Sequence, residues 1–189
     1  MRKIHPALLA LCLAGAVLAA CADDPVDSSA AIKTIFDEGL KDYDSGNFEA
    51  AYKKWSTIDE VDLAAMRNVG IMLRTGKGVQ KDPKAAEAML QRTAEAGLFT
   101  AQADLGDMLL KGEAGPPDPK AAAPWLAMAA QAGHPMAQYE LGQLYEQGDA
   151  IPKNIEAARA LYKAAAAGGV AEAAKRLAAL PPAPAPPTP

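Results

Sequence analysis

Residues able to act as nucleophiles or metal ligands are few in this sequence. It has two cysteines, Cys12 and Cys21, and two histidines, of which only His134 lies beyond an apolar N-terminal segment. His134 stands in a turn between a glycine and a proline, where we expect it to be solvated. No serine sits in a G-x-S-x-G or S-x-x-K motif, and no phosphate-binding glycine signature is present. We therefore predict a protein that is not an enzyme and holds no metal or other dissociable cofactor.

Carboxylates could still act in pairs as acid and base, but such a pair needs a fixed cleft. The relevant glutamates lie on the faces of predicted helices, where we expect them to be solvated: Glu38, Glu49, Glu87, Glu140 and Glu156. Specific chemistry is therefore predicted at one position, Cys21.

Cys21 follows an apolar run with a basic start. No charged residue interrupts positions 7–20. A membrane-spanning helix needs about 20 apolar residues, so this shorter run is typical of a secretory signal peptide, here residues 1–20. Cys12 lies inside that leader and would be removed with it, which argues against a disulfide between the two cysteines.

The residues Leu18-Ala19-Ala20-Cys21 resemble the lipobox of bacterial lipoproteins. The resemblance implies cleavage between Ala20 and Cys21 and a covalent lipid on the cysteine, and two or more acyl chains would anchor the protein durably. Alanine rather than aspartate follows the cysteine, which in that family implies the outer membrane of a Gram-negative cell, facing the periplasm. We expect residues 21–30 to comprise the lipidated cysteine and a flexible tether.

Composition favours helices built from small residues. Half of the residues are hydrophobic but only 5% are aromatic, which disfavours a sheet core. The net charge is −4, and it becomes −6 when Arg2 and Lys3 leave with the leader. A mildly acidic chain has no electrostatic reason to bind nucleic acid, so we expect a protein, peptide or glycan partner.

A repeat of 36 residues organises most of the chain. Three sets of residues align at this spacing without a gap: Gly70, Gly106 and Gly142; Gly76, Gly112 and Gly148; and Asp82, Asp118 and Asn154. This register predicts three repeats, at residues 62–97, 98–133 and 134–169.

Each repeat predicts two helices. The first should end at the second glycine of the repeat, because a left-handed turn has no steric cost there. The second should begin after the Asp or Asn, whose side chain can cap free amide groups. The first glycine falls inside a helix, where it costs about 1 kcal/mol relative to alanine, so we expect a closely approaching helix to compensate.

The pattern A-x-x-x-L-G-x-x-Y-x-x-G is best matched by Ala137, Leu141, Gly142, Tyr145 and Gly148. It resembles the Sel-one-like repeat (SLR), a relative of the tetratricopeptide repeat (TPR). The resemblance implies an all-α fold, a right-handed α-solenoid of TPR/SLR-type helix pairs. Residues 31–61 resemble a TPR-like first repeat, residues 170–180 predict a C-terminal capping helix, and residues 181–189 form a Pro-rich tail.

Pro124 departs from the repeat pattern. The sister repeats have Ala88 and Ala160 at this position. Proline in a helix interior removes a hydrogen bond at a cost of about 3 kcal/mol, so we expect a kink or a weakened turn before Trp125.

In TPR-like solenoids the first helices line the concave face. By motif register the candidate binding residues are Phe36, Leu40, Tyr43, Arg67, Ile71, Arg74, Asp107, Leu110, Tyr139 and Gln143. An apolar patch beside two arginines would suit an acidic or amphipathic peptide. We therefore predict a membrane-anchored periplasmic lipoprotein acting as a protein–protein interaction scaffold. The alternatives are an immunity or inhibitor protein that binds a toxin or hydrolase, and a regulator of envelope or peptidoglycan enzymes.

Overall fold

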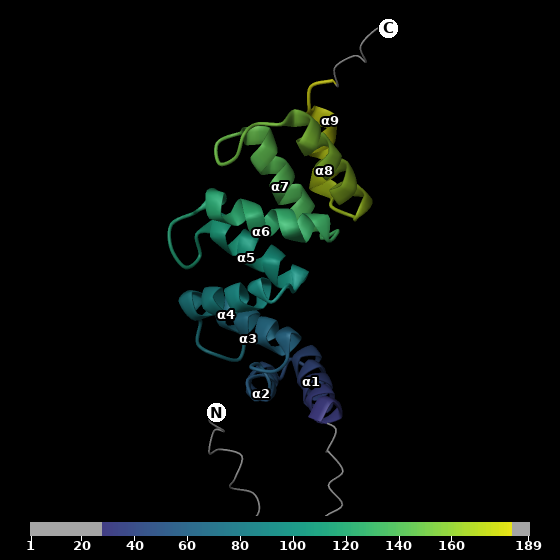
Figure 1. Ribbon diagram of the computed structural model, residues 1–189. Helices are drawn as coiled ribbons and strands as arrows, with labels where there is room; N and C mark the ends of the chain where they lie inside the picture. The colour runs from purple at the N-terminus through teal and green to yellow at the C-terminus, as the bar shows by residue number, and fades with distance from the viewer. Residues whose placement is uncertain (1–27, 183–189) are drawn as a thin grey trace, which may run out of the picture.

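The computed structural model describes residues 28–182, and every regular element in this range is an α-helix. The helices form an all-α solenoid of helix pairs, which confirms the predicted fold class (Figure 1). Their bounds are α1 Ser28–Asp44, α2 Phe48–Trp55, α3 Leu63–Thr75, α4 Pro83–Glu95, α5 Phe99–Lys111, α6 Pro119–Gln131, α7 Pro135–Gln147, α8 Ile155–Ala167 and α9 Ala171–Ala179.

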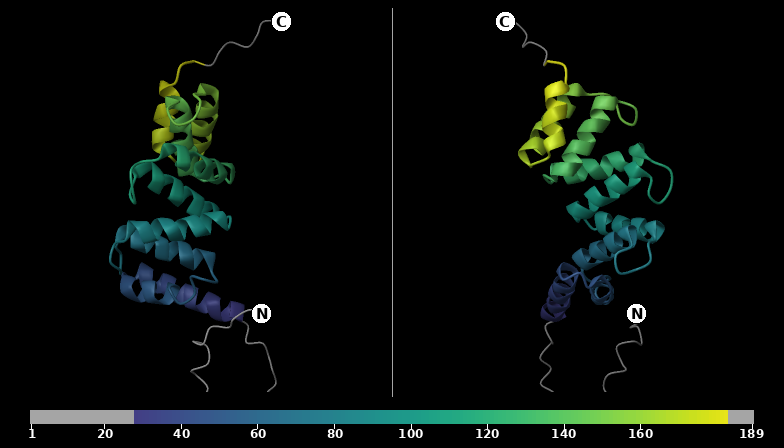
Figure 2. Two further views of the ribbon diagram at one scale, coloured as in Figure 1. Left: turned by 60° about the vertical axis from the view of Figure 1, so that its left-hand side comes forward. Right: turned by 180° about the vertical axis from the view of Figure 1, so that it is seen from behind.

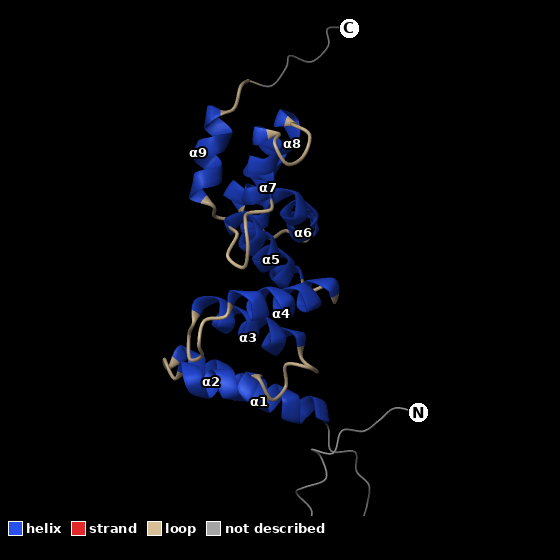
Figure 3. Ribbon diagram, turned by 90° about the vertical axis from the view of Figure 1, so that its left-hand side faces the viewer, coloured by secondary structure: helices blue, strands red, loops and turns tan. Residues whose placement is uncertain are grey.

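Successive helices pack against each other along the whole stack. The closest partners are α1 with α2, α3 with α4, α5 with α6 and α7 with α8, and α9 packs on α8 as a terminal helix. The first helices α5 and α7 of neighbouring pairs also touch directly. Figures 2 and 3 show α1 and α9 at opposite ends of an elongated stack. Each pair therefore contacts only its neighbours, as in other repeat proteins.

The predicted helix ends are confirmed. The side chains of Asp82, Asp118 and Asn154 accept hydrogen bonds from the backbone N–H three residues on, at 3.0, 2.9 and 2.9 Å. The first helices α3, α5 and α7 end at glycines with φ of 75°, 64° and 81°, in the left-handed region. Local sequence alone therefore sets where most of these helices begin and end.

The glycines inside the first helices lie against the second helices, as predicted. A Cβ atom on Gly106 would lie 2.5 Å from Leu126 Cδ2, and one on Gly142 would lie 2.7 Å from Tyr162 Cε1. Both distances are shorter than any real contact allows. Glycine is required here because the paired helices approach closely.

The first pair uses an aromatic cluster for the same purpose. A Cβ on Gly39 would lie 2.5 Å from Trp55 Nε1, and that nitrogen donates a hydrogen bond of 3.2 Å to the Phe36 carbonyl. The Tyr43 ring lies 5.7 Å from Trp55 and 5.0 Å from Phe48, between centroids. Buried Trp55 thus fixes the position of α1 on α2.

Two observations bear on the helix limits that the sequence predicted, one at the start of α1 and one at Pro124 in α6. Ser28 to Ala30 belong to α1, where the Thr34 hydroxyl donates to the Ala30 carbonyl, so these residues are not part of a flexible tether. Helix α6 continues through Pro124 and has the same length as α4 and α8, so Pro124 does not end the helix. Pro124 is exposed, and burial of Ala122, Ala123 and Leu126 holds the helix on either side of it.

Replacing Pro124 with alanine should stabilise the fold. The exchange restores an N–H donor to α6 at an exposed position, and we expect the free energy of unfolding to rise by about 1 to 3 kcal/mol. Urea denaturation followed by circular dichroism measures this change. The matched control Ala88→Pro, at the equivalent exposed position of α4, should lower stability by a similar amount. Equal stability of all three proteins would contradict a helical penalty at this position.

Candidate functional site

A cavity of about 270 Å³ opens on the first-helix face between α1 and α3, and we call it the N-terminal cavity. Four of the predicted binding residues line it together: Leu40, Tyr43, Arg67 and Ile71. Its wall includes buried Trp55, and Leu40 remains 43% exposed. The cavity is therefore mainly apolar with an aromatic wall, and its lining carries one cationic side chain, Arg67, and one carboxylate, Asp44.

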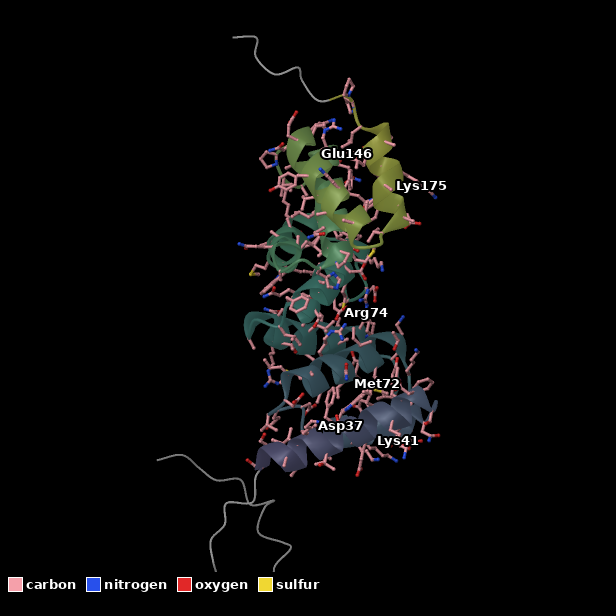
Figure 4. The ribbon with its side chains drawn as sticks, turned by 90° about the vertical axis from the view of Figure 1, so that its right-hand side faces the viewer. Asp37, Lys41, Met72, Arg74, Glu146 and Lys175 are labelled. Carbon is pink, nitrogen blue, oxygen red and sulfur yellow. The ribbon has the colours of Figure 1, made fainter. Side chains whose placement is uncertain are left out.

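Arg74 does not stand free on this face. Its Nε and Nη2 donate to the two carboxylate oxygens of Glu113 at 2.8 and 2.5 Å, and Nη2 also bonds Asp107 at 2.5 Å. The side chain is only 12% exposed, and the hydrogen bond to Glu113 raises the pKa of Arg74 above its ordinary value. Figure 4 labels Arg74 at mid-height of the stack, between Met72 and Glu146. This bidentate pair joins α3 to the loop that follows α5.

Arg67 makes an equivalent link about two turns earlier on α3. Its Nε donates to Asp104 Oδ2 at 2.5 Å, and both side chains are partly buried. Both arginines predicted to receive an acidic ligand are therefore already bound to carboxylates of the next repeat. An acidic ligand would have to displace those carboxylates.

A second cavity, of about 340 Å³, lies between α5 and α7, and we call it the central cavity. Carboxylates Asp104, Asp107 and Glu140 line it with Lys111, His134 and Met136. Only Asp107 among these was predicted as a binding residue.

Glu140 differs from its expected solvated state. It is partly buried, and burial together with the neighbouring Asp107 carboxyl raises the pKa of Glu140 to about 8. A carboxyl with this pKa is mostly protonated at neutral pH. The expectation failed because it considered the face of α7 alone, whereas α5 covers that face.

His134 also differs from its expected solvated state. Its Nδ1 accepts a hydrogen bond from the Ala137 N–H at 3.3 Å and so caps the start of α7. Burial lowers the pKa of His134, which favours the neutral imidazole that this acceptor role requires. The residue is a helix cap at the edge of the central cavity.

The remaining predicted face residues lie outside both cavities. Phe36 packs on Trp55, and Leu110 packs on the core between α6 and α7. Tyr139 packs on Tyr162, and its hydroxyl accepts a hydrogen bond from Gln143 Nε2 at 3.1 Å. These residues therefore support the stack and are not gathered into one groove.

Sequence reasoning missed Asp104, Lys111, Met136 and Glu140 as cavity residues. The 36-residue register did contain a signal, because Asp104 and Glu140 occupy the same repeat position. In the part of the chain that the structure describes, no group of three or more His, Cys, Asp or Glu residues is arranged to hold a metal ion. Within the same residues, no helix has the length and apolar character needed to cross a bilayer. Ala20 and Cys21 lie outside the described residues.

The stacked helix pairs, with hollows on their first-helix face, define an α-solenoid repeat protein. Residues 63–98, 100–134 and 135–170 each match the family model for the Sel1 repeat. The chain therefore belongs to the Sel1 repeat family, a scaffold that suggests protein–protein interaction. No curated protein matches the chain.

Solved structures agree with this family. The Sel1 repeat protein from Oxalobacter formigenes is 31% identical with a TM-score of 0.70, over 75% of this chain and 58% of that protein. The c5321 protein, a protective antigen of uropathogenic Escherichia coli with an SLR fold, is 27% identical with a TM-score of 0.72, over 80% of this chain and 34% of that one. The immunity protein Pa5087 from Pseudomonas aeruginosa shares the fold, at 23% identity and a TM-score of 0.53, over 79% and 58% of the two chains. The chain thus spans well under two thirds of the length of each.

Replacing Glu140 with glutamine should change how stability depends on pH. Because the folded-state pKa of about 8 lies above the ordinary 4.5, the folded chain holds this proton more tightly than the unfolded chain does. The stabilisation is complete below pH about 4.5 and is lost as pH rises through about 8. We expect the melting temperature of the native protein to fall relative to Glu140→Gln between pH about 4.5 and 8, by about 2 to 4 °C per kcal/mol.

Differential scanning calorimetry across this pH range provides the measurement. Glu95→Gln, the same exchange at an exposed position on α4, should leave the pH profile unchanged. If the melting temperatures of the native protein and Glu140→Gln change with pH in parallel, the pKa of Glu140 is not raised in the folded state.

Proposed function

We propose that this protein is a lipid-anchored periplasmic scaffold that recruits a protein partner through its first-helix face. The observation that carries the proposal is the N-terminal cavity, where Leu40, Tyr43 and Ile71 offer apolar contacts beside an aromatic wall. A cavity of this kind suits an apolar anchor side chain of a peptide or protein, because buried anchors supply most of the binding energy at interfaces. The proposed role is binding, without catalysis.

The proposed location depends on Cys21. The lipobox resemblance supports a lipid on this cysteine, and Ala22 supports the outer membrane as the destination. The lipid would fix where the solenoid works, and the first-helix face would select what it binds. Confinement of both partners to one membrane surface raises their effective concentration, so a modest affinity is sufficient.

A periplasmic immunity or inhibitor role is the second candidate. The likeness to the immunity protein Pa5087 supports only the compatibility of this fold with such a role. Tight one-to-one binding to a single toxin or hydrolase, with loss of that enzyme's activity, would favour this role over a scaffold. Binding to an envelope or peptidoglycan enzyme with a change in its activity would favour the third candidate, a regulator.

The N-terminal cavity can be tested by placing a charge in it. We expect Leu40→Asp to lower partner recovery at least tenfold in a crosslinking pulldown from intact envelopes, because a carboxylate is costly to desolvate against an apolar anchor. Val61→Asp is the matched control, since Val61 is 68% exposed and does not line the cavity. Circular dichroism should show both variants folded. Equal recovery of the same partner by native protein, Leu40→Asp and Val61→Asp would exclude this cavity as the binding site.

Charge reversal of Arg67 or Arg74 is a poorer test. Each arginine pairs with carboxylates of the next repeat, so lost binding could follow from a disturbed stack. Leu40→Asp avoids this ambiguity, because Leu40 takes no part in the ion pairs between repeats.

The anchor is tested separately by Cys21→Ala. We expect metabolic labelling with a radioactive fatty acid to mark the native protein and not the variant, and the variant to leave the membrane fraction. Fractionation of the two membranes in the same experiment measures the destination. Label that persists in Cys21→Ala would contradict lipidation at this residue.

A further inference from the structure

Neighbouring repeats are joined at one recurrent pair of positions, 37 residues apart. Arg67 of α3 and Asp104 of α5 occupy the first such pair and form an ion pair of 2.5 Å. Tyr139 of α7 and Arg176 of α9 occupy the last such pair, and Arg176 forms an ion pair of 3.5 Å with Glu146 of α7. The same spacing recurs at three junctions along the stack: α3 with α5, α5 with α7, and α7 with α9. An arginine is present at the first and the last of these junctions.

The middle junction lacks its cation. Here the register pairs Ala103 of α5 with Glu140 of α7. Ala103 takes the position that Arg67 has one repeat earlier, but a methyl group cannot reach or neutralise a carboxylate. Both residues line the central cavity of about 340 Å³, so the space that an arginine side chain would fill is open.

The charges around the central cavity leave Glu140 as the carboxylate without an ion pair. Asp104 is paired with Arg67, and Asp107 is paired with both Arg74 and Lys111. Among the ion pairs within residues 28–182, none includes Glu140. Burial and Asp107 raise the pKa of Glu140 to about 8, although the charges of Lys111 and Arg74 oppose this shift. A cation close to Glu140 would release that proton and gain a charge-assisted hydrogen bond.

We propose that the central cavity binds an arginine side chain of a protein partner, whose guanidinium pairs with Glu140 in the place that Arg67 takes one repeat earlier. The proposal rests on the proposed function, because it states which side chain the recruited partner presents. Met136 is 45% exposed at the cavity and offers an apolar surface to the methylene stem of such a side chain. Guanidinium fits better than ammonium, since its planar fork matches a carboxylate in two contacts.

The test uses N-acetyl-argininamide as the probe and N-acetyl-citrullinamide as its neutral isostere. Both are titrated into the full chain while the methyl resonances of its methionines are followed by NMR. We expect argininamide to shift Met136 and to bind at least tenfold more tightly than citrullinamide. We expect Glu140→Gln to lower that affinity at least tenfold and Glu140→Asp, which keeps the carboxylate, to retain part of it. Equal binding of the two probes, or undiminished binding to Glu140→Gln, would overturn the proposal.

A second variant tests the geometry from within the chain. Ala103→Arg should place its own guanidinium on Glu140, as Arg67 does on Asp104, and so abolish argininamide binding while the methionine spectrum stays that of a folded protein. Ala103→Gln, of similar length and without charge, is the control and should fail to restore a pair with Glu140. Lowered melting temperature for Ala103→Arg relative to Ala103→Gln would show that no cation is accommodated there, and would contradict the proposal.

The argininamide titration and the crosslinking pulldown test separate sites, so either can fail without the other. If Leu40→Asp loses its crosslinked partner but argininamide does not bind, the arginine site is wrong and the scaffold role stands. If argininamide binds by way of Glu140 but Leu40→Asp keeps its partner, the N-terminal cavity is wrong as the recruiting site and the arginine site stands.

Discussion

The close contact between a glycine inside each first helix and a large side chain of its paired helix is the constraint on which this solenoid depends. At Gly106 there is no room for even a methyl group against Leu126, and at Gly142 none against Tyr162. Helices α3 to α8 share one length, and they recur at the 36-residue spacing of the sequence. That spacing in turn places equivalent side chains of neighbouring repeats opposite one another.

Features decided within one repeat could be predicted from the sequence, whereas features decided between repeats could not. The Asx caps at Asp82 and Asn154 and the left-handed glycine at Gly76 depend on a few consecutive residues, and all were found. The state of Glu140 depends on α5, which lies more than 20 residues away in sequence. Register alignment identified equivalent positions but did not reveal which of them touch. The offset of 37 residues became visible only in the structure.

Pro124 and His134 show two further ways in which local reasoning is overridden. Burial of the residues on either side of Pro124 holds α6 helical even though a backbone hydrogen bond is missing. His134 caps a helix with its side chain, as the equivalent Asp62 does, whereas the equivalent Leu98 and Val170 provide no side-chain cap. Tertiary packing decides the first case, and the chemistry of a single substituted side chain decides the second.

One ion pair connects the two cavities of the first-helix face. Arg67 lines the N-terminal cavity, and its partner Asp104 lines the central cavity. A cation that reaches Asp104 as well as Glu140 in the central cavity would compete with Arg67, and an anion at the N-terminal cavity would compete with Asp104 for Arg67. Because coupling between two binding sites is reciprocal, each event would favour the other by the same factor. A partner with an apolar anchor, a neighbouring acidic group and an arginine would therefore be distinguished from one that offers any of these alone. In this way two modest hollows on the first-helix face can together select a partner.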